Sequence, residues 1–194
     1  MKQFVFGLGN PGDEYRQTRH NIGYQAIDAL TTLLTGQDFS QAAREHHKTK
    51  TLLYRTGELF LAKSLTYMNE SGQAVLSTVD YFDKQLVADI KSGKPAGTWE
   101  HPQLIVIYDD LDIPVGQWKL QFGKGPKVHN GLNSIRSHLG SDQFLHVRIG
   151  IDGRQGIRQQ SGKDYVLTPF LGEEQQQMGD VLTEVCQTLR LRLQ

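Results

Sequence analysis

Short apolar runs alternate with segments of helical period along the whole chain. Runs of aromatic and branched residues that stop at glycine or polar clusters indicate buried strands, and apolar residues spaced three and four apart indicate helices. Strands interleaved with helices predict an α/β fold, a mixed twisted sheet with helices on both faces. The predicted strands are 3–8, two runs within 50–64 that meet in a hairpin at 56–58, 103–110, 117–122 and 144–151. The predicted helices are 22–34, 70–82, 130–139 and 173–192.

The first predicted helix has clear ends, whereas two other stretches lack any period. Asn21 is a suitable N-cap, and Gly36 ends the helix because glycine accepts the left-handed conformation of a C-terminal cap. Residues 89–102, rich in glycine and proline, predict an exposed loop. Residues 153–164 are basic and punctuated by glycine, and of the two loops they are the stronger candidate for a function.

Length and composition suit one domain over residues 1–194, because 194 residues with 38% hydrophobic content can bury one core. The 21 basic and 21 acidic residues balance, so net charge favours neither a polyanion nor a membrane as partner. No stretch approaches the roughly 18 apolar residues of a membrane span, so we expect a cytoplasmic protein that binds no membrane. We expect Cys186 to lie in the core, and nothing demands an oligomer, so we expect a monomer.

The loop GLGNPGDEYRQTRHN, residues 7–21, could serve two functions. Gly7, Gly9 and Gly12 match the dinucleotide pattern GxGxxG, in which the helix begins within the glycine run and its amides meet a pyrophosphate. Here Pro11 interrupts the glycines, and the helical period starts only after a polar stretch. The spacing therefore disfavours a dinucleotide site.

The second function for this loop is to present polar side chains to a substrate. It leaves the carboxyl end of the first predicted strand, where open α/β proteins place their chemistry. It delivers Asn10, Arg19, His20 and Asn21 together, so we expect a site here.

Three acids, Asp109, Asp110 and Asp112, end the predicted central strand. A buried carboxylate is costly unless paired, and one bonded to an imidazole nitrogen fixes the tautomer in which the other nitrogen acts as a base on water. A divalent-ion site or a capping turn is the alternative. No metal-ligand spacing is present, so we expect no metal site, and we expect surface or packing roles for His46, His47, His101, His138 and His146.

Two further stretches supply amides. Asn69 in TYMNESG and Asn130 in VHNGLNS stand at the start of predicted helices, where asparagine is commonly only a cap. An amide both donates and accepts hydrogen bonds, so together with Asn10 these residues suit recognition of a peptide backbone or of a developing oxyanion.

Four segments together resemble the signature segments of bacterial peptidyl-tRNA hydrolase: GLGNPGDEYRQTRHNIG, KSLTYMNESG, YDDLDIPVG and HNGLNSIRSHLG, in the family's order over about residues 3–170. The resemblance implies the fold of that family. It also implies an esterase that cleaves the bond between a peptide's C-terminal carbonyl and the 3′-terminal ribose of tRNA, recycling the tRNA without a cofactor. The implied partner is peptidyl-tRNA, both its acceptor end and its attached peptide.

The resemblance also implies roles for individual residues. His20 resembles the catalytic base, Asp109 the acid that orients it, and Asn10 the residue that holds His20 and the water or carbonyl. The other implied contacts are to substrate: the peptide and the tRNA end at Asn69 and Asn130, the peptide channel at Tyr67 and Met68, a further contact at Tyr15, and tRNA phosphates at Arg148, Arg154 and Arg158.

Charge is distributed unevenly along the chain. Between Lys119 and Lys163 there are eight Lys or Arg and two acids, a net charge of +6, so the remainder carries −6. A basic segment on an otherwise acidic chain is expected of a protein that contacts phosphates, and it predicts salt-dependent binding. Without the resemblance, a solvated charged face explains it equally well.

Three departures from the family pattern stand out. Pro126, Lys127 and Val128 replace a glycine-rich run before His-Asn-Gly, residues 89–102 are longer than usual, and the chain stops at RLRLQ, short of the usual tail. Two other functions stay open: a catalytically silent RNA-binding protein of the same fold, and a nucleotide-binding α/β protein. The presence of both His20 and Asp109 favours the hydrolase.

Overall fold

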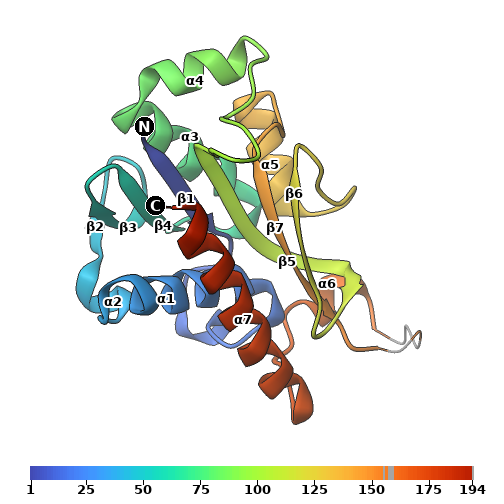
Figure 1. The fold of residues 1–194 in the computed structure, drawn as a ribbon. Helices are drawn as coiled ribbons and strands as arrows, with labels where there is room; N and C mark the ends of the chain where they lie inside the picture. The colour runs from blue at the N-terminus through green and yellow to red at the C-terminus, as the bar shows by residue number, and fades with distance from the viewer. Residues whose placement is uncertain (155, 157–159, 194) are drawn as a thin grey trace.

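A computed structural model describes residues 1–154, 156 and 160–193, and its strands and helices alternate along the chain (Figure 1). The strands are β1 (Gln3–Gly7), β2 (Arg44–His46), β3 (Thr51–Thr56), β4 (Leu59–Ser64), β5 (Leu104–Pro114), β6 (Trp118–Phe122) and β7 (Leu145–Asp152). The helices are α1 (Ile22–Thr35), α2 (Phe39–Ala42), α3 (Ser71–Phe82), α4 (Lys84–Lys91), α5 (Asn130–Leu139), α6 (Gly162–Tyr165) and α7 (Glu173–Arg192). Three short 3₁₀ helices are η1 (Asp13–Tyr15), η2 (Arg19–Asn21) and η3 (Met68–Glu70).

In the described part of the chain, seven strands form one mixed sheet in the order β2-β3-β4-β1-β5-β7-β6. The four central strands β4, β1, β5 and β7 are parallel, and antiparallel pairs complete both edges. Gly7 at the end of β1 pairs with Ile107 of β5. Because parallel strands end at the same edge, this register brings the loop after β1 beside the acids that follow Ile107.

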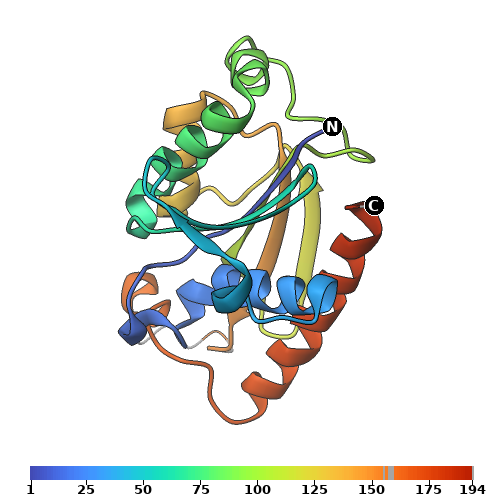
Figure 2. The same ribbon diagram turned by 90° about the vertical axis from the view of Figure 1, so that its left-hand side faces the viewer.

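Helices cover both faces of the sheet, as predicted. α1 and α7 lie on one face, and α3, α4 and α5 lie on the other, so that the sheet is sandwiched between two helical layers (Figures 1 and 2). Side chains alternate between the two cores because successive residues of a strand point to opposite faces. In β1, Val5 packs with α1 and α7, whereas Phe4 and Phe6 pack with the other layer.

Two glycines allow α1 to lie directly on β1. A Cβ atom at Gly7 would come within 2.1 Å of the Gly23 carbonyl oxygen, and one at Gly23 within 2.4 Å of the Ile107 oxygen. Such overlaps would push α1 off the sheet. The first glycine of the apparent nucleotide pattern therefore serves helix packing, and α1 begins at Ile22, well after Gly12.

The structure corrects two predicted boundaries. The strand predicted at 103–110 continues to Pro114, because the chain pairs again with β7 after an irregularity in register. The loop predicted at 89–102 is not wholly exposed. Residues 89–91 complete α4, and Ala96 is buried in the core, where its N–H donates to the Gln143 carbonyl (2.7 Å).

Two other predictions concern the core and membrane spans. Cys186 is buried between α7 and α1 within the core, as predicted, and burial raises the pKa of its thiol to about 12. Among the residues that the structure describes, no helix combines the length and the apolar content needed to traverse a bilayer.

Candidate active site

The structure joins the two predicted clusters directly, because His20 lies against Asp109. His20 sits in η2, where its backbone N–H donates to the Val166 carbonyl (2.8 Å) and fixes the short helix against the segment after α6. Its ring Nδ1 lies 2.8 Å from Oδ1 of Asp109 in β5. His20 and Asp109 are 8% and 2% exposed, so the pair is largely shielded from water.

Opposing effects set the protonation of this pair. Burial disfavours the imidazolium of His20, but attraction by the Asp109 carboxylate and their hydrogen bond outweigh it, so the pKa of His20 is raised above 6.5. Burial alone would raise the pKa of Asp109, but two neighbouring imidazoles overcome this effect and lower it well below its usual range. Asp109 is therefore an anion at neutral pH.

The second imidazole belongs to His129, which the sequence analysis did not select. Its Nε2 lies 3.1 Å from the same Oδ1 of Asp109 that contacts His20. Its Nδ1 accepts the backbone N–H of Leu132, so His129 is the N-cap of α5, and Asn130, considered above as a cap, is the first helical residue. The signal in the sequence was its position directly before Asn130 in a segment already chosen for its amide.

Asn10 is held rigidly beside this pair. Its backbone N–H and C=O form 2.9 Å bonds with the side-chain amide of Asn21, so Asn21 holds this loop and does not cap α1 through its side chain. The side-chain oxygen of Asn10 accepts the backbone N–H of Met68 (2.8 Å). Among the described residues no hydrogen bond joins Asn10 to His20, so the implied hold of Asn10 on His20 is not direct.

Three ligand-type atoms of His20, Asp109 and His129 lie within 4.8 Å of one another, a spacing at which a metal ion could contact all three. The carboxylate oxygen already contacts both ring nitrogens at 2.8 and 3.1 Å. In addition, His129 accepts at Nδ1 from Leu132, so its Nε2 carries the proton and has no lone pair for a metal. The geometry is that of hydrogen-bonded imidazoles, and a cation would have to break it.

These residues open onto a pocket of about 1040 Å³, here called the His20 pocket. The predicted residues Tyr67, Met68, Asn69 and Asn130 line it together with Asn10, His20 and Asp109. Tyr15 packs edge-to-face on Tyr67, with ring centroids 6.5 Å apart. Further lining residues are Asp110, Leu111, Asp112, Pro126, Lys127, Val128, His129, Arg154, Gln160, Ser161, Gly162, Lys163, Val166 and Leu167.

Arg148 is engaged elsewhere. It is 9% exposed in β7, its Nε donates to Oδ2 of Asp110 (2.7 Å), and its Nη1 donates to the side chain of Gln121. Arg154 lines the His20 pocket and also pairs with Asp152 (2.7 Å). Arg158 lies outside the described residues.

His146 is a packing residue, as expected for it. It is fully buried, donates from Nε2 to the Asp142 carbonyl and accepts the Tyr108 hydroxyl at Nδ1 (both 3.0 Å). Burial lowers its pKa to about 4, so the ring stays neutral.

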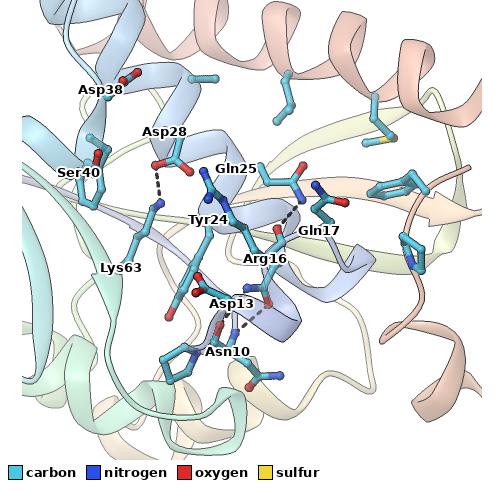
Figure 3. Close-up of a pocket in the computed structure, with 18 of the residues that line it drawn as sticks. Asn10, Asp13, Arg16, Gln17, Tyr24, Gln25, Asp28, Asp38, Ser40 and Lys63 are labelled. Carbon is cyan, nitrogen blue, oxygen red and sulfur yellow. Dashed lines mark hydrogen bonds and ion pairs between the residues drawn. The ribbon is translucent and has the colours of Figure 1, made fainter.

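A second hollow, the α1 groove, has a volume of about 920 Å³ and shares the lining residue Asn10 with the His20 pocket (Figure 3). Two of its charged groups are paired: Lys63 of β4 forms an ion pair with Asp28 of α1. Burial lowers the pKa of Lys63, opposed by that partner. The residues that define this groove include Asn10, Asp13, Arg16, Gln17, Tyr24, Gln25, Asp28, Phe39, Lys63 and Phe170.

Comparisons with known proteins agree with this geometry. The family model described as peptidyl-tRNA hydrolase matches residues 4–194. A peptidyl-tRNA hydrolase of Geobacillus thermodenitrificans is 42% identical over 90% of this chain and 83% of its own, and one of Aquifex aeolicus is 36% identical over 96% and 88%. The crystal structure of the Acinetobacter baumannii peptidyl-tRNA hydrolase superposes with a TM-score of 0.77 at 26% identity, covering 98% of this chain and 87% of that one. The chain therefore belongs to the peptidyl-tRNA hydrolase family.

Proposed function

We propose that this protein hydrolyses the ester between the C-terminal carbonyl of a peptide and the 3′-terminal ribose of tRNA, with water activated by His20. The observation that carries the proposal is the 2.8 Å bond between Nδ1 of His20 and Asp109 at the wall of the His20 pocket. This bond occupies one ring nitrogen and leaves Nε2 for chemistry.

The proton transfers follow from the tautomer. An anionic carboxylate only accepts, so Nδ1 of His20 carries the proton and Nε2 is a free base. Nε2 takes a proton from water as the oxygen attacks the ester carbonyl. The imidazolium, stabilised by Asp109, then returns that proton to the departing ribose oxygen. An alkoxide leaves more readily than an amide anion, so an ester needs no covalent nucleophile.

Asn10 suits stabilisation of the oxyanion. Because its oxygen is held by the Met68 N–H, the NH₂ end of the amide is left for a ligand in the pocket. A donor fixed before the reaction stabilises developing charge at no cost of reorganisation, which is the main requirement of an oxyanion site.

The residues that line the pocket include apolar, amide and basic groups. Tyr67 and Met68 suit the peptide, whereas Asn69 and Asn130 suit its backbone and the tRNA end. Lys127, Arg154 and Lys163 supply positive charge at the same pocket, which suits phosphates. Phosphate contact by Arg148 stays a prediction, and its bond to Asp110 gives it a second role in holding that acid in place.

We also propose that residues 1–194 act as one catalytic domain, monomeric and cytoplasmic. A single sheet carries both cores and the pocket, which supports one folding unit. The +6 segment from Lys119 to Lys163 supports a polyanionic partner.

The test is release of the amino acid from N-blocked aminoacyl-tRNA, with unblocked aminoacyl-tRNA as control and salt varied. Cleavage of the blocked substrate supports the proposal. Salt-dependent tRNA binding with no release would identify a silent RNA-binding protein instead. Saturable binding of free mononucleotides with no ester cleavage would identify a nucleotide-binding protein.

A further inference from the structure

One carboxylate oxygen serves two imidazoles. Oδ1 of Asp109 lies 2.8 Å from Nδ1 of His20 and 3.1 Å from Nε2 of His129, and the two ring centroids are 5.4 Å apart. His20 has a nitrogen left for the substrate, but both nitrogens of His129 are engaged within the protein. His129 also lines the His20 pocket, but neither of its ring nitrogens is left for the substrate, and its contact with the proposed base runs through Asp109.

A backbone hydrogen bond determines the tautomer of His129. Leu132 N–H donates to Nδ1 (3.3 Å), so Nδ1 is an acceptor and the neutral ring carries its proton on Nε2, facing Asp109. The opposite tautomer, with the proton on Nδ1, would place two donors face to face and break the cap of α5. The cap thus directs the Nε2–H of His129 at Asp109.

Tight packing keeps the ring in this position. Tyr108 contacts it edge-to-face with centroids 5.1 Å apart, and a Cβ atom at Gly131 would lie 3.2 Å from its Cε1. Within the described residues, the other ionisable groups named around the two rings are either paired or line the pocket. Asp110 is bound to Arg148, Tyr108 donates to His146, and Asp112, Lys127, Arg154 and Lys163 line the pocket.

We propose that His129 is a positioning residue that tunes the proton affinity of His20 by sharing the Asp109 carboxylate. A second N–H on Oδ1 stabilises the anion and reduces its attraction for the imidazolium of His20. Without that donor, the carboxylate acts on His20 alone, and His20 holds its proton more tightly. The consequence for catalysis rests on the proposed function, whereas the effect on His20 itself does not.

Two substitutions separate this role from helix capping. His129→Asn keeps a side-chain oxygen for the Leu132 N–H but is too short to reach Asp109, so it preserves the cap and removes the donor. His129→Gln is long enough to place an amide NH₂ near the former Nε2, so it restores the donor without an ionisable ring. Thermal unfolding of both variants checks that each is folded.

The primary measurement is an NMR titration of the His20 ring in the protein without substrate. We expect His129→Asn to raise the pKa of His20 by about half a unit or more, and His129→Gln to return it towards the wild-type value. The pH profile of hydrolysis is the second measurement: the acidic limb of kcat/KM should move to higher pH by the same amount in His129→Asn.

The outcomes distinguish this inference from the proposed function. An unchanged pKa of His20 in folded His129→Asn would reduce His129 to a helix cap. Equal shifts in both variants would assign the effect to loss of the imidazole ring and not of the donor. Either result would overturn the inference while leaving hydrolysis intact. A shift in the NMR titration with no ester cleavage by the wild type would overturn the proposed function and leave the coupling between the two histidines established.

Discussion

The His20 pocket and the α1 groove start from the same residue, Asn10, and have similar volumes of about 1040 and about 920 Å³. Both contain a pair of ionisable groups, buried in the His20 pocket and only partly buried in the α1 groove. In the α1 groove, Lys63 has its charge neutralised by Asp28. In the His20 pocket, Asp109 engages only one nitrogen of His20. A side chain is available for chemistry when its partner occupies one functional atom and leaves another facing the cavity. We expect that of His20 in the His20 pocket and not of Lys63 in the α1 groove.

The largest expected effect comes from removing the available nitrogen. His20→Ala should lower kcat/KM for an N-blocked aminoacyl-tRNA by about 10² to 10⁴, because a general base contributes that much. Single-turnover release of the blocked amino acid measures the loss, and circular dichroism checks the fold. A residual rate within about tenfold of the wild type would mean that His20 is not the general base, and the contrast with the α1 groove would fail.

Asn10 lines both hollows, so substituting it tests whether its amide contributes to hydrolysis in the His20 pocket. Asn10→Asp keeps the oxygen that accepts the Met68 N–H but lacks the NH₂ group, so kcat should fall by about 10² to 10³, as for loss of an oxyanion donor. Measuring kcat and KM separately checks this, because a loss confined to KM indicates a role in binding only. Asn10→Ala, which removes both ends of the amide, is the matched variant.

The Asp109 carboxylate determines the pH at which kcat/KM rises. A base works only when neutral, so kcat/KM should rise with pH through the pKa of His20, which lies above 6.5. In Asp109→Asn, burial still lowers that pKa but the attraction is gone, so the midpoint should move to lower pH and the plateau should fall roughly tenfold or more. A midpoint that stays in place in the variant contradicts the assigned role of Asp109.

The smallest effect is expected in the α1 groove. Lys63→Met leaves Asp28 exposed to water, so hydrolysis should stay within about twofold of the wild type and the free energy of unfolding should change by about 1 kcal/mol or less. Hydrolysis and thermal unfolding measured in the same buffer check both values. A tenfold loss of activity in a folded Lys63→Met protein would show that the two hollows are coupled through Asn10.

Much of the fold was predictable because each long element has a strong local signal. The strand at 3–8 and the helix at 22–34 are specified by apolar period and by Gly36, whose φ of 72° is the left-handed conformation expected of a cap. The short elements α2 and β2 were not predicted, because four and three residues carry no period. The end of β5 was missed because the pairing of Pro114 with Asp152 involves a distant segment.

The site was predictable as a set of residues but not as a set of bonds. Loop position and chemistry singled out His20, Asp109 and Asn10, and the structure brings them to one pocket. The sequence did not reveal that Asn10 is anchored by Met68, that Arg148 is paired with Asp110, or that His129 shares Asp109. Each of these contacts spans at least 20 residues along the chain.

By itself, the sequence determined the α/β fold and the family, and it singled out His20 and Asp109 as the proposed base and acid, because period, glycine placement and motif spacing are local properties. Tertiary structure alone decided which carboxylate oxygen each imidazole meets and which nitrogen is left free. Hydrogen bonds depend on fractions of an ångström and on the tautomer, and both are set where β1, β5 and α5 meet.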